Sequence, residues 1–204
     1  MHLQVEKIYK KYNRRYILKN ISFTAKQGQS VAITGPNGSG KTTLIKILTQ
    51  IIRPDKGTLV FYLDNHKLSP ENLNRHIGLI GPYLQLYQEL TAYENLRFIS
   101  QLRRVPHAEK RIKELAAAVG LERHIHRAVH TYSSGMKQRL KYLFAIMGDP
   151  DFLFVDEPTS NLDKDGISWV YQLLDEWKRD KVLVFATNDE QDLNYADEVV
   201  TVVA

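Results

Sequence analysis

Alternating apolar and polar positions open the chain and predict a β-hairpin. Residues 3–9 and 16–23 alternate as half-buried strands do, and a polar turn at residues 13–15 separates them. The apolar run at residues 30–34 predicts a short buried strand that leads directly into a glycine-rich turn at residues 35–40. The start of the chain is therefore expected to be built from strands.

A helical repeat of apolar positions follows the glycine-rich turn. One face of the predicted helix is formed by Leu44, Ile47, Leu48 and Ile51. Residues 58–63 predict a further strand, whereas residues 91–147 carry apolar stripes at helical spacing. Strand-like runs return at residues 152–155 and 182–186, and a helical pattern separates them.

Strands and helices that alternate at both ends of the chain, with helices between them, predict an α/β fold. We expect a mostly parallel sheet with helices, an antiparallel β subdomain at the N-terminus and an inserted α-helical subdomain. Residues 1–204 are expected to form a single domain. Within it, residues 1–83 and 148–204 make the core with its β subdomain, and residues 84–147 make a helical lobe.

The composition is that of a globular protein and excludes several kinds of site. Of the 204 residues, 43% are hydrophobic and 25% are charged, which permits a sizeable core. No apolar run approaches the roughly 18 to 20 residues that a membrane-spanning helix requires, and the N-terminus lacks a signal-peptide pattern. The chain has no cysteine, so disulfides, thiol catalysis and cysteine metal sites are excluded.

The net charge of +5 would suit an anionic partner, but the basic residues are scattered along the chain. We therefore expect no nucleic acid partner. The tightest basic cluster consists of Lys10, Lys11, Arg14 and Arg15. This cluster fits either a solvated hairpin or a position near a phosphate or a lipid headgroup.

The glycine-rich turn matches the phosphate-loop pattern G-x-x-x-x-G-K-[ST] between a predicted strand and a predicted helix. Its glycines let successive backbone amides face phosphates, and the helix that follows adds partial positive charge. Lys41 should reach the β and γ phosphates, and the Thr42 hydroxyl should ligate Mg²⁺. The nucleotide-binding residues predicted here are Gly35, Pro36, Asn37, Gly38, Ser39, Gly40, Lys41, Thr42 and Thr43. The pattern predicts a P-loop NTPase core.

Two carboxylates follow the apolar run at residues 152–155. Asp156 and Glu157 lie at the C-terminal end of a predicted strand, which is where open α/β sheets bind ligands. Beside a phosphate loop, Asp156 should hold Mg²⁺ directly or through water. Glu157 should orient or deprotonate the attacking water, so we predict it to be catalytic together with Lys41.

Taken together, these motifs resemble the ATP-binding cassette (ABC) ATPase family over essentially the whole chain. Residues 132–139, Tyr-Ser-Ser-Gly-Met-Lys-Gln-Arg, resemble the family signature. The resemblance implies that Ser133 and Gly135 contact the γ phosphate of ATP bound by an opposing subunit. Residues 90–96 resemble the start of the family's helical lobe, and residues 160–163 resemble the loop that communicates across the dimer.

Tyr12 lies where the family carries an aromatic residue that stacks on adenine. The alternative is a hairpin tyrosine packed on the sheet, because Tyr9 and Tyr16 are near. We treat Tyr12 as a candidate contact for the adenine ring of ATP.

Three positions depart from the family pattern. The glutamine that normally touches Mg²⁺ is replaced by Pro82. A shift of the loop would make Gln85, or alternatively Gln88, the candidate metal ligand; the simpler interpretation is that the nucleotide and the helical lobe are coupled differently in this chain. Asn188 stands where the family usually has a histidine; an asparagine can donate a hydrogen bond to the γ phosphate but cannot become cationic. Ser134 replaces the first glycine of the signature. These departures predict slow hydrolysis that still depends on Glu157.

The resemblance implies two ATP molecules, with Mg²⁺, held between the phosphate loop of one subunit and the signature of another. We expect a homodimer or a heterodimer with a homologous ATPase, bound at the cytoplasmic face of the cell membrane to separate membrane-spanning transporter subunits. Residues 81–82 and 90–98 are also somewhat similar to the haem-exporter ATPase of cytochrome c maturation. The alternatives are a DNA-maintenance ATPase of the same superfamily and a nucleotide-dependent switch with slow turnover.

Overall fold

An antiparallel sheet forms one layer of the computed structural model, which describes residues 1–203. Strands β1 (His2–Tyr12) and β2 (Arg15–Lys26) make the predicted hairpin, and β4 (Lys56–Leu63) and β5 (His66–Lys67) extend the sheet in the order β2-β1-β4-β5. The hairpin turns at Asn13 and Arg14, whose φ angles of 47° and 65° suit the tight turn of a two-residue hairpin loop. The hairpin prediction is confirmed, with strands longer than the sequence pattern indicated.

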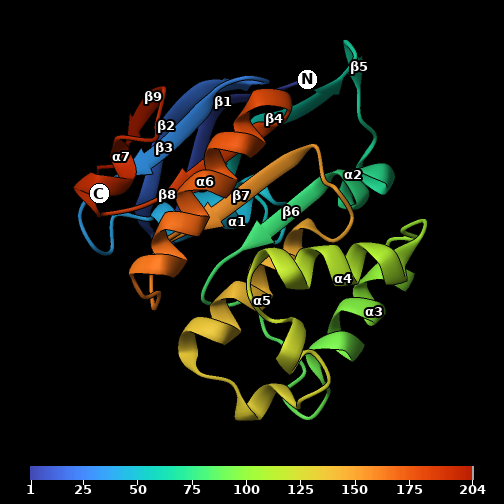
Figure 1. The fold of residues 1–204 in the computed structure, drawn as a ribbon. Helices are drawn as coiled ribbons and strands as arrows, with labels where there is room; N and C mark the ends of the chain where they lie inside the picture. Colours follow the sequence, from blue (N-terminus) through green and yellow to red (C-terminus); the bar gives the residue numbers. More distant parts are fainter. Residues whose placement is uncertain (204) are drawn as a thin grey trace.

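A parallel sheet forms the second layer (Figure 1). Its order is β6 (Ile77–Ile80), β7 (Phe152–Asp156), β8 (Val182–Ala186), β3 (Ser30–Thr34) and β9 (Glu198–Thr201). Strands β7 and β8 are buried at every position, as expected for central parallel strands that read as continuous apolar runs. The sequence pattern correctly predicted the three central strands and missed β6 and β9, which have only four residues each.

Helix α1 (Lys41–Leu48) contributes its apolar face to a core that includes residues of both sheets. Leu44, Ile47 and Leu48 are fully buried as predicted. The prediction for Ile51 is wrong: the helix ends at Leu48, and Ile51 is 54% exposed. A left-handed residue at Gln50 (φ 59°) turns the chain, which removes Ile51 from the helical repeat.

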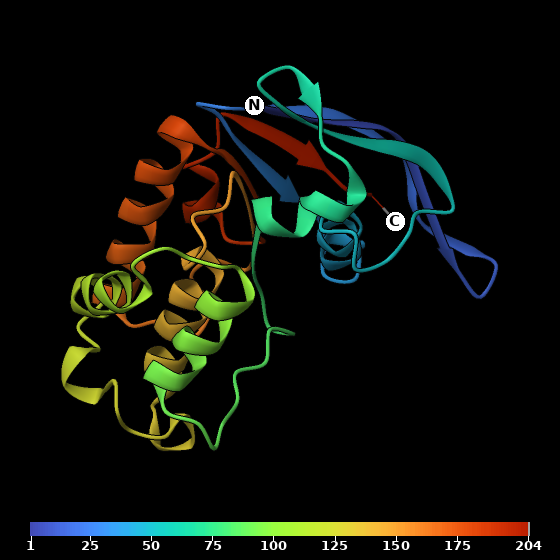
Figure 2. The ribbon, with the colours of Figure 1, turned by 90° about the vertical axis from the view of Figure 1, so that its right-hand side faces the viewer.

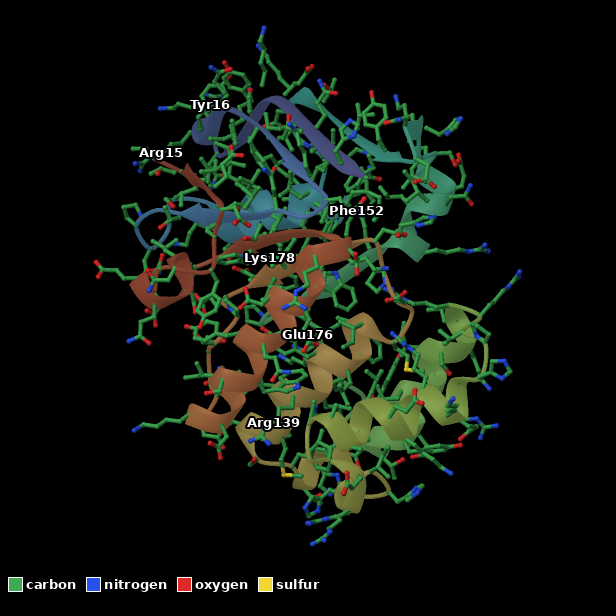
Figure 3. The ribbon with its side chains drawn as sticks, turned by 45° about the horizontal axis from the view of Figure 1, so that its top comes forward. Arg15, Tyr16, Arg139, Phe152, Glu176 and Lys178 are labelled. Atoms are coloured by element: carbon green, nitrogen blue, oxygen red, sulfur yellow. The ribbon has the colours of Figure 1, made fainter. Side chains whose placement is uncertain are left out.

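The two sheets are joined by aromatic packing. Phe61 of β4 meets Phe152 of β7 edge to face, with ring centroids 5.0 Å apart, and Phe152 lies among the side chains between the layers (Figure 3). Both rings belong to the same buried cluster. The cluster fixes the position of β7, whose far end carries the two acidic residues predicted to act on a nucleotide.

Helices occupy the middle of the chain and form the lower part of the molecule in Figure 2. The main ones are α3 (Ala92–Leu102), α4 (Ala108–Ala118) and α5 (Ser134–Ile146). Two short 3₁₀ turns, η1 (Glu122–His124) and η2 (Val129–Thr131), connect α4 to α5, and α2 (Pro70–His76) precedes β6. Helix α3 starts with a capping box in which Thr91 and Glu94 bond each other's backbone amides. The limits of the helical lobe at residues 84 and 147 stay a prediction.

The last elements return to the parallel sheet. Helix α6 (Lys164–Asp180) packs beside β8, and the short helix α7 (Glu190–Leu193) precedes β9. Val170 and Leu174 of α6 are buried, as the helical pattern predicted. Within residues 1–203, no helix is both long and apolar enough to span a bilayer.

Candidate nucleotide-binding site

The phosphate loop joins β3 to α1, where the sequence pattern predicted it. Gly35 has a φ of 146°, and a Cβ atom there would lie 2.2 Å from the carbonyl oxygen of Val202. Gly40 has a φ of 108°, and a Cβ atom there would lie 2.6 Å from Cγ2 of Ile17. Both positions require glycine because the backbone is left-handed and a neighbouring element packs against it.

The side chain of Lys41 folds back over the loop. Its Nζ atom is nearly buried and donates to the carbonyl oxygens of Gly35 (2.8 Å) and Pro36 (3.2 Å). The Oγ atom of Ser39 is buried and has no hydrogen-bond partner in residues 1–203. The loop therefore holds a cation and an unused hydroxyl at the start of a helix, which is a chemical setting for phosphate oxygens.

Asp156 lies at the end of β7, where it is 2% exposed. Burial raises the pKa of its carboxyl group, and a hydrogen bond from Thr42 together with the nearby charge of Lys41 opposes this rise. Its Oδ2 atom is buried without a hydrogen-bond partner in the described part of the chain. A carboxylate oxygen left unused beside a hydroxyl is a donor set that fits Mg²⁺, which prefers oxygen ligands.

Glu157 follows directly in an unusual backbone conformation. Its φ of 57° is in the left-handed region, which residues other than glycine rarely occupy. The amide of Glu157 donates to the carbonyl oxygen of Ala186 at the end of β8 (2.8 Å), and its side chain is exposed. The side chain lines a hollow together with Thr187 and Asn188. Backbone strain of this kind is typical of functional positions. The left-handed conformation directs the Glu157 carboxylate away from the sheet.

Asn188 connects the loop after β8 with the phosphate loop. Its Nδ2 atom donates to Oδ1 of Asn37. Since β3, β7 and β8 are adjacent in the sheet, their C-terminal ends bring the predicted residues together. The residues that meet at this edge are Asn37, Lys41, Thr42, Asp156, Glu157 and Asn188.

Tyr12 ends β1 and is 45% exposed, with Nζ of Lys10 located 5.5 Å from the centre of its ring. Tyr9 and Tyr16 pack edge to face against each other, at a centroid distance of 5.9 Å. The packed hairpin tyrosines are therefore Tyr9 and Tyr16. The open ring of Tyr12 is compatible with the alternative role, in which it stacks on a base.

Gln85, the candidate metal ligand, is exposed and lines a hollow with Ser134 and Gln138 of α5. The alternative residue, Gln88, donates to the carbonyl oxygen of Leu86 in its own loop. Neither glutamine lines the hollow formed by Glu157, Thr187 and Asn188. The assignment of Gln85 as a metal ligand stays a prediction.

The signature residues lie at the start of α5. The Ser133 hydroxyl caps the helix by accepting from the amide of Met136 (3.2 Å), and Gly135 lies in the first turn. Arg139 donates to both carboxylate oxygens of Asp163 (3.2 and 3.1 Å) at the start of α6. In Figures 1 and 2 this end of α5 lies in the helical part of the molecule, apart from α1. One chain thus does not bring the signature and the phosphate loop together.

Sequence reasoning missed a buried carboxylate behind the site. Asp192 of α7 is 2% exposed and accepts from the hydroxyl groups of Thr187 (2.5 Å), Tyr171 (2.8 Å) and Thr159 (3.2 Å). These donors belong to the loop after β8, to α6 and to the loop after β7. The network fixes the two loops that carry Glu157 and Asn188. No periodic pattern marks Asp192, because its partners come from distant parts of the chain.

Comparison with known sequences gives one family. The family described as ABC transporter matches residues 18–160. The uncharacterized ABC transporter ATP-binding protein YdbJ of Bacillus subtilis (strain 168) is 37% identical over 165 residues, which are 81% of this chain and 53% of that protein. The lantibiotic transport ATP-binding protein SrtF of Streptococcus pyogenes is 33% identical over 186 residues, which are 91% of this chain and 79% of that protein.

Some of these relatives are considerably longer proteins. The chain spans 53% of YdbJ and 62% of YxlF, a second uncharacterized ABC transporter ATP-binding protein of Bacillus subtilis (strain 168) that is 35% identical over 188 residues. The match to YxlF covers 91% of this chain. The similarity therefore extends over only part of these two relatives.

Solved structures agree with the sequence comparison. The structure described as an ATP-binding subunit of an ABC transporter is 27% identical and has a TM-score of 0.89. The match covers 100% of this chain and 86% of that chain. A second structure is the dimeric ATP-binding cassette MJ0796, described as a post-hydrolysis state bound to ADP and Pi. It is 27% identical with a TM-score of 0.86, and the match covers 98% of this chain and 94% of that chain. Since the family match extends over well more than half of the sequence and the fold agrees throughout, the chain belongs to the ABC transporter family of ATP-binding proteins.

Proposed function

We propose that this chain is the ATP-binding and ATP-hydrolysing subunit of an ABC transporter. The observation that carries the proposal is the buried, unpartnered Oδ2 atom of Asp156, which lies beside Thr42 at the end of the phosphate loop. A buried carboxylate oxygen without a partner is rare in folded proteins unless a ligand uses it. Lys41, Glu157 and Asn188 at the same edge of the sheet supply the remaining chemistry.

The chain's own residues divide the work of hydrolysis. Backbone amides of residues 35–42 and Nζ of Lys41 bind and orient the phosphates. Thr42 and Asp156 would hold Mg²⁺, which neutralises developing charge when bound. Glu157 orients the attacking water and accepts its proton. Asn188 donates a hydrogen bond to the γ phosphate and leaves the proton on Glu157, since an amide cannot accept one.

The proposed site is completed by a second molecule, either a copy of this chain or a homologous ATPase. Ser133 and Gly135 lie at a helix start whose amides favour an anion, yet the phosphate loop of the same chain is elsewhere. A second subunit in the opposite orientation would place its signature residues against the ATP bound by this chain's phosphate loop. The structure of MJ0796, described as dimeric and bound to ADP and Pi, supports the pairing of two such chains.

We further propose that separate membrane-spanning subunits, with the dimer at their cytoplasmic face, use this ATPase cycle. Relatives named for lantibiotic transport and for molybdate/tungstate import support a role in transport. These named cargoes differ chemically although the ATP-binding regions are similar. The contribution assigned to this chain is accordingly the motor, and cargo recognition is assigned to the membrane subunits.

A slow nucleotide-dependent switch is the second candidate function, because Asn188 cannot relay a proton and Pro82 stands where the family has the glutamine that touches Mg²⁺. The DNA-maintenance alternative is not favoured, since the relatives named above are transport proteins or ABC transporter ATP-binding proteins. Turnover measured with Mg²⁺ and a membrane-embedded partner separates a motor from a switch.

Substitution of Glu157 tests the proposed function. We expect Glu157→Gln to bind Mg-ATP as the parent does and to hydrolyse it roughly 10²- to 10⁴-fold more slowly, because the base that accepts the proton is lost. Calorimetric titration and phosphate release measure the two properties. Glu114→Gln, on the exposed face of α4, is the matched control. Equal, nonzero hydrolysis rates for Glu157→Gln and the parent would contradict the assignment.

A further inference from the structure

The loop after β6 places an aromatic side chain beside Asp156. At Gly81, an added Cβ atom would lie 3.0 Å from Cζ of Tyr83 and 3.3 Å from Cβ of Asp156. The phenol end of Tyr83 and the carboxylate-bearing carbon of Asp156 therefore flank the same glycine. This arrangement requires the small residue at position 81, because a larger one would push the two side chains apart.

Both side chains carry an unused polar atom. The hydroxyl of Tyr83 is buried, and none of the described residues accepts or donates a hydrogen bond to it. The Oδ2 atom of Asp156 is in the same state. A buried polar atom without a partner is costly, and two such atoms on side chains that flank the same glycine indicate that the pair is arranged for a third group.

The surroundings fix the ring of Tyr83, whose hydroxyl keeps its proton. Nζ of Lys46, on α1, lies 4.6 Å from the centre of the Tyr83 ring, which is a cation–π contact. A tyrosine hydroxyl, with an ordinary pKa of about 10, carries its proton at neutral pH and is available as a hydrogen-bond donor.

We propose that the hydroxyl of Tyr83 donates a hydrogen bond to an oxygen of Mg-ATP at the Thr42–Asp156 site, as a binding residue for the metal-bound nucleotide. This inference rests on the proposed function and extends it to a residue that no sequence motif marks. The proposed contact is a hydrogen bond to the nucleotide and differs from the metal ligation predicted for Gln85. The loop that carries Tyr83 leads to α3, so the contact also ties the nucleotide to the helical part of the chain.

The test compares nucleotide binding with and without Mg²⁺ in a background that cannot hydrolyse ATP. We expect Tyr83→Phe, combined with Glu157→Gln, to weaken ATP binding in Mg²⁺ by roughly 2- to 10-fold, the value of one hydrogen bond. Binding in EDTA should be unchanged, because the contact is made in the metal-bound complex. Tyr87→Phe is the matched control, since Tyr87 is half exposed and lies in the same loop.

Stability of the nucleotide-free protein separates binding from folding. Tyr83→Phe removes an unpaired buried hydroxyl, so the midpoint of urea denaturation should stay at or above that of the parent. Equal affinity of Tyr83→Phe and its background in Mg²⁺ would overturn the proposal, as would equal losses with and without Mg²⁺. If the Glu157→Gln background itself failed to bind Mg-ATP, the proposed function would fail first.

Discussion

The phosphate loop and the loops that flank it are built in different ways. In residues 35–42 the backbone makes the site, and glycines allow the backbone to take its conformation. In the loops after β6 and β8, the side chains of Tyr83 and Asn188 lie beside the site. Pro82 and Asn188 in these two loops depart from the family pattern. The backbone conformation of the phosphate loop consequently restricts which residues it can contain. The flanking loops, residues 81–85 and 187–189, can accept different side chains.

The difference between the phosphate loop and the flanking loops shows which parts of a nucleotide site can vary in sequence. Phosphate oxygens are bound in the same way whatever the protein does next, so the loop that cradles them has little freedom. The flanking loops instead set how binding is converted into hydrolysis and movement. Tyr83 and Asn188 lie in the flanking loops, and we expect their substitution to change coupling more than it changes folding.

The largest expected effect tests the backbone-built loop. Gly35→Ala should lower the free energy of unfolding by about 3 to 5 kcal/mol, because the new Cβ atom meets the carbonyl oxygen of Val202 while the backbone is held left-handed. The amide of Val202 is bonded to Thr34 (2.8 Å), so this segment cannot simply move away. Urea denaturation monitored by circular dichroism measures the loss.

Gly38→Ala is the matched control within the same loop. Its φ of 79° is also left-handed, but no atom lies within 4 Å of an added Cβ. The loss in unfolding free energy should therefore be confined to about 1 to 2 kcal/mol of backbone strain. Equal losses for the two substitutions would mean that close packing against Val202 has no part in shaping the loop.

A smaller effect is expected where the loop uses a side chain. Lys41→Ala should weaken Mg-ATP binding by roughly 10- to 100-fold, because a charge-assisted contact to phosphate contributes about 1.5 to 3 kcal/mol. Equilibrium titration with Mg-ATP measures the change. Lys110→Ala, which removes an exposed lysine of α4, should bind as the parent does. An undiminished affinity of Lys41→Ala would place the phosphates elsewhere.

Sequence reasoning was most successful where local chemistry decides the structure. The glycine spacing located the phosphate loop, and the continuous apolar runs located β3, β7 and β8, because buried parallel strands need no polar positions. It failed where contacts from distant segments decide the outcome. The predicted place of Ile51 was lost to a single left-handed residue, Gln50, and Asp192 gains its meaning only from its three hydroxyl partners.

The same limit applies at the predicted metal site. Counting back along the chain from the helical lobe placed Pro82 where the family has its glutamine, and Gln85 or Gln88 became candidates only after a shift of the loop. Counting cannot show which side a loop residue faces, and the turn that begins at Gly81 brings Tyr83 to Asp156. A tyrosine directly after a proline carries no signal that distinguishes a binding residue from a packed one.

The smallest expected effect is on the pH dependence of hydrolysis, and it concerns Asn188 in the loop after β8. In the parent, position 188 cannot change its charge, so hydrolysis should show no pH step that belongs to it. A histidine there is cationic below its ordinary pKa of about 6.5 and neutral above it. Cationic Asn188→His gains a charge-assisted bond to the γ phosphate, so its rate relative to the parent should rise by roughly 2- to 10-fold as pH falls through this value.

Phosphate release between pH 5.5 and 8.5, at saturating Mg-ATP, measures this ratio directly. Asn194→His is the matched control, because Asn194 is an exposed residue at the end of α7 and should give a ratio that does not vary with pH. A flat profile for Asn188→His as well would mean that position 188 does not reach the γ phosphate during turnover. Its bond to Asn37 would then serve to hold the two loops together, and Tyr83 and Glu157 would be left as the side chains through which this edge of the sheet responds to ATP.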